Sequence, residues 1–287
     1  MGVLLGPPRR PGPALRPAPG ARRVREGPGV SAPAPLARRA AAEGLGTAAL
    51  VAVVVGSGIQ AAGLTHDTGL QLLANSLATV FGLGVLVALL GPVSGAHFNP
   101  AVTLAAHVTG RRTGEGPAPR EVAAYVPAQV VGAVAGAVLA DAMFGEPVMT
   151  FSTTERWGGH LWLAEAVATA GLVCLVLGLV RTGRTHLAPP LVAAYIGAAY
   201  WFTSSTAFAN PAVTIGRAFT DTFAGIAPAS VLPFLAAQAV GAAAGLALAA
   251  VCFGRPPAAT GNDAAPAPGV RRPAAPARTA EESAVTR

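Results

Sequence analysis

The same five residues, Asn-Pro-Ala-Val-Thr, occur twice in this sequence, at 99–103 and again 111 residues later at 210–214. Asn is a favoured N-cap and Pro a favoured first helical residue, so each copy predicts a helix start. Both copies lie between long apolar runs, which places both helix starts at membrane depth. One copy alone would be an ordinary turn before a helix. Two copies in matching frames predict a channel or transporter built as an inverted repeat with broken helices.

The composition indicates a membrane protein. Of the 287 residues, 52% are hydrophobic and only 11% are charged, whereas a soluble domain carries roughly 25% charged residues. All 20 basic residues are Arg and they lie mostly in the ends of the chain and short loops, which argues against a nucleic-acid partner. No nucleophile–base pair, metal-ligand cluster or phosphate-binding loop is present, so we expect neither an enzyme nor a cofactor or metal. Cys174 and Cys252 lie in apolar runs and are expected to be buried and unpaired.

The chain divides into one membrane domain and two polar ends. Residues 1–39 are rich in Pro, Gly, Ala and Arg, and 254–287 are rich in Pro and Ala, so both are predicted to be disordered. The domain at 40–253 contains two predicted half-length helices, 99–109 and 210–220. The second span is expected to end at Gly91-Pro92, and the first half-helix at Gly110. Six membrane spans are predicted: 40–62, 69–90, 121–143, 160–180, 187–204 and 228–253.

The distribution of arginines predicts the orientation. Six spans put both ends on one side, and that side carries 18 of the 20 arginines, leaving only Arg156 and Arg217 opposite. The positive-inside rule therefore places both termini in the cytoplasm, for a protein of the plasma membrane.

The two halves match beyond the Asn-Pro-Ala copies. Glu43-x-x-x-Thr47 recurs as Glu165-x-x-x-Thr169, and the Gln-x-x-Gly that begins at Gln129 recurs at 238–241. Because each half has three spans, the second half must insert upside down relative to the first. The two half-helices then enter from opposite sides and meet near the midplane.

This combination resembles the aquaporin, or major intrinsic protein, family over the whole of 40–253. The resemblance implies an all-α membrane protein with six transmembrane helices and two re-entrant half-helices in an inverted 3+3 repeat. It also implies a homotetramer in the lipid membrane, in which each subunit carries its own pore for water and small neutral solutes.

The two motifs are expected to form the centre of the pore. The asparagine oxygens should cap their own half-helices, the asparagine amides should face the pore, and the positive helix ends should repel cations. Irregular backbone at membrane depth is tolerated where it lines a wet cavity, so the carbonyls before each motif should form acceptor ladders. The expected motif residues are Asn99, Pro100, Ala101, Asn210, Pro211 and Ala212, and the expected carbonyls are those of Gly95, Ala96, His97, Thr206, Ala207 and Phe208.

Glu43 and Glu165 are ionisable residues inside spans and are therefore functional candidates. The resemblance implies that such carboxylates hold the re-entrant loops by hydrogen bonds to loop backbone and to His. Glu43 could instead extend to the interface. We interpret His97 as a structural histidine rather than a gate.

The selectivity filter departs from the pattern of the family. The resemblance implies an Arg directly after the second Asn-Pro-Ala, where this chain has Val213. The four expected filter residues are Thr79, Ala198, Ala207 and Val213. Phe81 is the alternative to Thr79, and Gly197 is the alternative to Ala198. The four expected residues predict a wide constriction with few hydrogen-bond donors, which passes uncharged molecules larger than water.

Arg217 follows one turn after Val213 and has two interpretations: a substitute filter residue at the outer mouth, or an ion pair with Asp221. The run 208–226 resembles a bacterial branch linked to arsenic resistance, which suggests neutral arsenous acid or glycerol-like polyols as solutes. Two alternatives to a channel remain at this point: a secondary transporter that uses Glu43 and Glu165, or a non-conducting scaffold whose Arg-rich ends bind lipid headgroups.

Overall fold

The structure is a computed structural model that describes residues 34–113 and 116–254. The disorder predicted for 1–33 and 255–287 lies outside the described residues. Every regular element in the described ranges is helical. The elements are α1 (Leu36–Leu64), α2 (Thr68–Ser94), α3 (Pro100–Thr113), α4 (Pro119–Phe144), α5 (Gly159–Arg181), η1 (Thr185–Leu187), α6 (Ala188–Phe202), α7 (Pro211–Gly216), η2 (Arg217–Phe219) and α8 (Pro228–Phe253).

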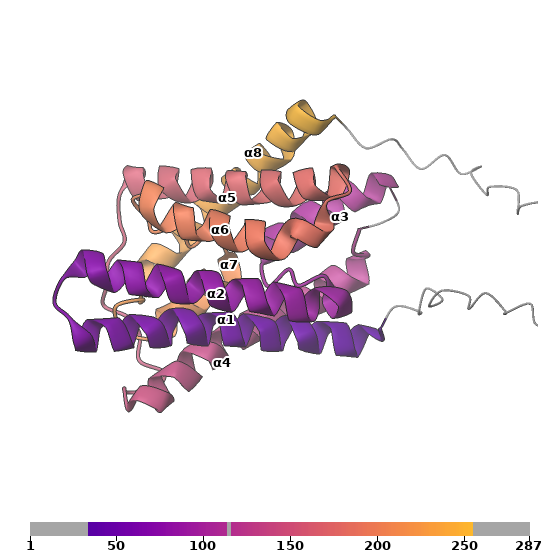
Figure 1. The fold of residues 1–287 in the computed structure, drawn as a ribbon. Helices are drawn as coiled ribbons and strands as arrows, with labels where there is room; N and C mark the ends of the chain where they lie inside the picture. The colour runs from indigo at the N-terminus through magenta and orange to yellow at the C-terminus, as the bar shows by residue number, and fades with distance from the viewer. Residues whose placement is uncertain (1–33, 114–115, 255–287) are drawn as a thin grey trace, which may run out of the picture. The chain divides into compact units, whose positions relative to one another are not determined.

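The order of the elements repeats. Long helices α1, α2 and α4 with half-helix α3 form the first half, and α5, α6 and α8 with half-helix α7 form the second. Helix α1 packs most extensively against α4, and α5 packs most extensively against α8. Figure 1 shows the pair α1 and α2 on one side and the pair α5 and α6 on the other, with α7 between them. Both half-helices contact long helices of both halves: α3 packs against α4, α5 and α8, and α7 packs against α1, α4 and α8.

Within residues 34–113 and 116–254, five helices are long and apolar enough to cross a membrane: α1, α2, α4, α5 and α8. The fifth predicted span, 187–204, is helical but shorter, because α6 has 15 residues and Thr203 is extended. The 3-10 turn η1 directly precedes α6, and the continuous helical run 185–202 is roughly 27 Å long, close to the thickness of the hydrocarbon core.

Three helices are longer in the structure than the sequence predicted. Helix α1 begins at Leu36, so the predicted disordered end at 1–39 is wrong over its last four residues. Helix α2 continues through Pro92 to Ser94 and ends only where Gly95 adopts a left-handed conformation with φ 94°. A proline near the end of a transmembrane helix removes one backbone hydrogen bond without ending the helix. The first half-helix likewise runs past Gly110 to Thr113.

Small residues at the helix contacts let the long helices approach closely. The buried core contains many alanines, and glycines of α4 and α8 face the backbone of α1 and α5. This packing is typical of membrane helices. Both cysteines are free thiols: Cys174 is half-buried, but Cys252 is exposed in the last turn of α8, contrary to its predicted burial.

Candidate functional site

The two repeated asparagines meet through reciprocal hydrogen bonds. The side-chain oxygen of Asn99 accepts from Ala101 N at 2.8 Å, and that of Asn210 accepts from Ala212 N at 3.0 Å. Each amide then donates to the other half: Asn99 Nδ2 to Ala209 O, and Asn210 Nδ2 to Phe98 O, both at 2.8 Å. An amide NH₂ has two N–H groups, so each asparagine keeps one donor beyond this cross-link, and both residues line a cavity.

The backbone before each motif has an unusual conformation that repeats between the halves. Ala96 and Ala207 both have φ 48°, and Phe98 and Ala209 have φ 48° and 46°. Such values cost free energy in residues other than glycine and persist only when surrounding contacts hold them. The two re-entrant segments therefore need an anchor.

In the first half that anchor is Glu43, which is fully buried. One carboxylate oxygen accepts from the Ser94 hydroxyl at 2.6 Å and from His97 N at 3.0 Å. The other accepts from Phe98 N at 2.6 Å and from the Gln129 amide at 2.8 Å. A buried carboxylate is tolerated when several donors satisfy it, and Glu43 therefore does not extend to the interface.

Glu165 has the equivalent role in the second half. It is also fully buried, and it accepts from Phe208 N and Ala209 N, each at 2.8 Å. Gln238 donates to the same carboxylate at 2.7 Å and to the Thr214 hydroxyl at 2.8 Å. The recurrence of Glu and Gln in the two halves thus corresponds to one repeated network.

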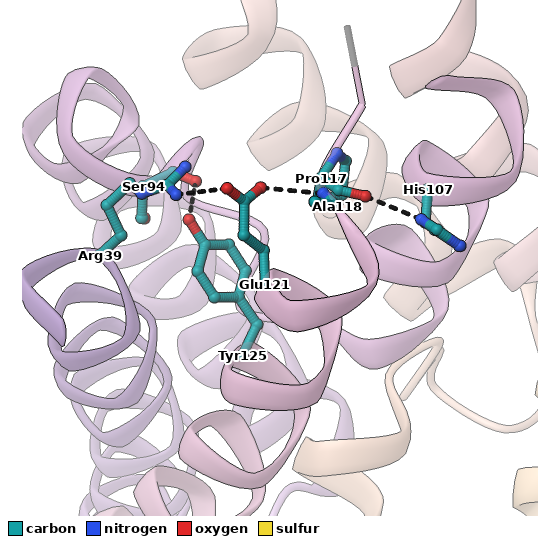
Figure 2. Close-up of polar contacts among 7 residues, drawn as sticks. All are labelled: Arg39, Ser94, His107, Pro117, Ala118, Glu121 and Tyr125. Carbon is teal, nitrogen blue, oxygen red and sulfur yellow. Dashed lines mark hydrogen bonds and ion pairs between the residues drawn. The ribbon is translucent and has the colours of Figure 1, made fainter. Parts of the chain in front are cut away.

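A second polar cluster lies at the start of α4 (Figure 2). Arg39 forms an ion pair with Glu121 at 2.5 Å, and Glu121 also accepts from Ala118 N at 3.0 Å. This contact ties the first turn of α1 to the first turn of α4.

The same cluster supports the first re-entrant segment. The Tyr125 hydroxyl donates to Ser94 O at 2.9 Å, and Ser94 in turn donates to Glu43. His107 Nδ1 bonds Pro117 O at 2.7 Å, which fixes α3 to the segment before α4. His97 Nδ1 lies 3.1 Å from the hydroxyl of Thr103, in the motif itself.

The cavity between the half-helices has a volume of about 110 Å³, which is room for several water molecules. It is walled mainly by apolar side chains of α1, α2, α5 and α6. Its lining residues overlap with those of a second, larger cavity of about 940 Å³ beside α3 and η1. The shared residues are Val87, Gly95, His97, Val176 and Ala188.

Of the residues whose carbonyls were expected to face the path, Thr206 is not part of the cavity wall. The other five line the cavity: Gly95, Ala96, His97, Ala207 and Phe208.

Three of the four expected filter residues, Thr79, Ala207 and Val213, are buried and line the cavity. The position on α6 is different, because Tyr200 and Ile196 line the cavity there. The Tyr200 hydroxyl lies 3.2 Å from the Thr79 hydroxyl, so the two form a polar pair in the wall.

The prediction that Ala198 belongs to the filter is wrong. Ala198 is exposed on the outer side of α6 and does not line the cavity. Neither alternative residue lines the cavity: Gly197 faces Val80 of α2, and Phe81 is 69% exposed. A tyrosine within an apolar helix was the available signal for Tyr200, since a hydroxyl at membrane depth needs a polar partner.

Arg217 also corrects the prediction of a filter with few donors. It is buried, lines the cavity, and its guanidinium carbon lies 3.5 Å from the centre of the Phe208 ring. Its Nε donates to Ala224 O. The ion pair with Asp221 is not formed, because Asp221 instead accepts from Thr153 N at 2.8 Å and from the Thr153 hydroxyl at 3.0 Å.

Comparisons with known proteins agree with this geometry. The profile of the major intrinsic protein family matches residues 31–204. Aquaglyceroporin AqpS of Rhizobium meliloti (strain 1021) is 53% identical over 213 residues, covering 74% of this chain and 89% of the relative. The chain belongs to the major intrinsic protein family. It is an integral membrane channel for water and small solutes and not an enzyme.

More distant relatives fit the same assignment. Aquaporin NIP1-3 of Oryza sativa subsp. japonica is 35% identical over 190 residues, covering 63% of each chain. The solved structure of the aquaglyceroporin from Plasmodium falciparum has a TM-score of 0.52 at 20% identity, covering 75% of this chain and 94% of that one. That likeness shows the aquaporin-like fold. Membership of the family favours the channel over the transporter and the scaffold.

Proposed function

We propose that this channel conducts, besides water, uncharged hydroxylated solutes larger than water, with arsenous acid and glycerol-like polyols as candidates. The supporting observation is the cavity wall: apolar side chains with a few polar groups, among which Thr79, Tyr200 and the two asparagines offer hydrogen bonds. A solute with several hydroxyls exchanges hydrogen bonds along such a path while its carbon or arsenic face contacts the apolar side. Arsenous acid is neutral near pH 7 and similar in size to glycerol.

The residue directly after the second motif is Val213, and the arginine that lines the cavity is Arg217, one turn farther along. Its guanidinium N–H groups add hydrogen-bond donors for the oxygens of a hydroxylated solute, which suits the proposed solute range. The similarity to a relative named as an aquaglyceroporin is consistent with this range.

We further propose that the protein is a homotetramer of the plasma membrane with both termini in the cytoplasm. The arginine distribution supports the orientation. The many exposed large apolar side chains of α2 and α8 suit contact with lipid or with neighbouring copies.

Stopped-flow light scattering on proteoliposomes tests the solute proposal. Vesicles challenged with arsenous acid or with glycerol at neutral pH should shrink quickly and then re-swell faster than empty liposomes. Fast shrinkage with re-swelling no faster than in empty liposomes would limit the function to water. Traces equal to those of empty liposomes for all solutes would contradict the proposal.

A further inference from the structure

Arg217 lies on the same helix face as Val213, because a separation of four residues is about one helical turn. Side chains in a helix lean toward its N-terminus, and the backbone of Arg217 is helical, with φ −70° and ψ −10°. The long side chain of Arg217 is therefore directed back toward the surface beside Val213. Both residues line the same cavity.

The Arg217 guanidinium is held on one side and unpaired on the other. It lies over the Phe208 ring, and its Nε is fixed by Ala224 O. Among the described residues no other hydrogen bond to this guanidinium is formed, so four of its five N–H donors have no protein partner. Arg156, Tyr200 and Glu165 lie within electrostatic range of it.

A second arginine in the same region differs in one respect. Arg156 Cζ lies 5.0 Å from the centre of the Phe208 ring, and Arg156 Nε donates to Gly225 O at 2.9 Å. Arg156 does not line the cavity. The two arginines thus share one aromatic ring, but only Arg217 reaches the pore.

We propose that Arg217 is the specificity-determining cation of this pore, acting from one turn beyond the position next to the motif. Its charge excludes cations, and its free N–H groups bind the oxygens of passing neutral solutes. Val213 is the small side chain that leaves room for it. This inference rests on the proposed function, because it concerns how the same pore selects its solute.

The first test compares Arg217→Gln with Arg156→Gln in proteoliposomes of the full chain. Water and glycerol rates are measured by light scattering, and sodium and proton leak by dyes enclosed in the vesicles. Removal of the pore charge in Arg217→Gln should raise the cation leak at least about tenfold, since a charge acts strongly at short range in a medium of low dielectric. The ratio of glycerol to water flux should also change. Arg156→Gln removes a charge outside the cavity wall and should change the leak and the ratio much less than Arg217→Gln does.

Arg217→Lys separates the charge from the hydrogen-bonding fork. Lysine keeps the charge but lacks the planar fork of five donors, so cations should stay excluded while the glycerol-to-water ratio shifts. Wild-type leak and ratio in both Arg217 variants would overturn the inference alone. A wild-type protein that passes neither water nor glycerol would overturn the proposed function and the inference together.

The second test moves the arginine and does not depend on Arg217→Gln being stable. Val213→Arg places a second guanidinium where Arg217 already lies and should reduce water flux at least about fivefold by occlusion and charge repulsion. Combining Val213→Arg with Arg217→Val leaves one arginine in the wall of the cavity and should restore water flux and cation exclusion. Equal water flux in the single and the double variant, per folded protein by gel filtration, would show that the two side chains do not share one space and would overturn the inference.

Discussion

At the scale of single residues, the two buried glutamates support the pore without entering its wall. Each carboxylate accepts two consecutive backbone N–H groups of a segment in which three residues have positive φ. These bonds offset the free energy that such backbone angles cost. The peptide groups of the pore therefore keep a fixed direction, which a chain of small apolar residues would not impose by itself.

Glu165→Gln should destabilise the protein by about 1–3 kcal/mol, because the amide has one acceptor oxygen and leaves a buried N–H of the second segment unpaired. The thermal unfolding midpoint in detergent should fall, and water flux per folded protein should fall with it. Glu155→Gln is the matched control, since Glu155 is exposed in the loop before α5. Equal midpoints for the two variants would mean that the segment does not depend on this carboxylate.

The residue scale also shows where sequence reasoning succeeded and failed. The Asn-Pro-Ala copies predicted the half-helices and their meeting, because capping is a local property of the residues themselves. The position on α6 was transferred by counting back from the second motif to Ala198. That count crosses the irregular residues 203–209, where the chain does not advance by a fixed angle. An error of two residues turns a helix position by about 200°, which is the difference between exposed Ala198 and pore-lining Tyr200.

The sequence could not decide between the two interpretations of Arg217, for a different reason. The spacing of Arg217 from Val213 was visible in the sequence, but both interpretations required knowing what Asp221 contacts. Thr153, the residue that binds Asp221, lies 68 positions away in the loop between the halves. A contact at that separation is set by the tertiary fold and leaves no local pattern.

At the scale of helices, close approach between backbones holds each half together. An added Cβ at Gly132 or Gly136 of α4 would clash with backbone carbonyls of α1, and one at Gly241 or Gly245 of α8 would clash with those of α5. The glycines therefore set the distance between these helices. Since α4 and α8 also carry Gln129 and Gln238, that distance decides whether the glutamine amides reach the buried carboxylates.

Gly132→Ala should cost about 1–3 kcal/mol, because the methyl group would overlap Gly44 O and force α1 and α4 apart. Gly63→Ala is the control: it lies in α1 with no atom within 4 Å of the added carbon, and it should be neutral or stabilising by up to about 1 kcal/mol. Thermal unfolding in detergent measures both. A fall in the midpoint for Gly63→Ala as large as for Gly132→Ala would contradict a packing explanation.

At the scale of the whole molecule, the segment between α4 and α5 joins the two halves. It pairs with the chain after α7, through Ser152 N to Ala218 O at 3.1 Å and Ala227 N to Thr154 O at 2.7 Å. Thr153 and Asp221 add a further link. This connection lies directly beside Arg217, so the filter is held by both halves.

The Thr153–Asp221 link predicts a pH dependence. The backbone N–H and then the hydroxyl of Thr153 lower the pKa of Asp221 below its ordinary value of 3.8. A lowered carboxyl pKa contributes stability above the unfolded pKa, and that stability is lost as the pH falls through the folded pKa. Asp221→Asn should therefore unfold at a lower temperature than wild type at about pH 7. The difference should shrink as the pH falls below the ordinary carboxyl pKa of 3.8 and through the lower pKa of the folded state. A difference that does not change with pH would exclude a charge effect.

The reciprocal bonds of Asn99 and Asn210 have a consequence for how the protein is made. During synthesis Asn99 leaves the ribosome 111 residues before Asn210, yet its amide partner is the carbonyl of Ala209. The first half can therefore insert its helices while its own motif still lacks a permanent partner. The hydrogen bonds at the centre of the channel form only when the second half has inserted in its opposite orientation. Each half thus supplies the carbonyl group that the asparagine amide of the other half needs in order to complete its hydrogen bonds.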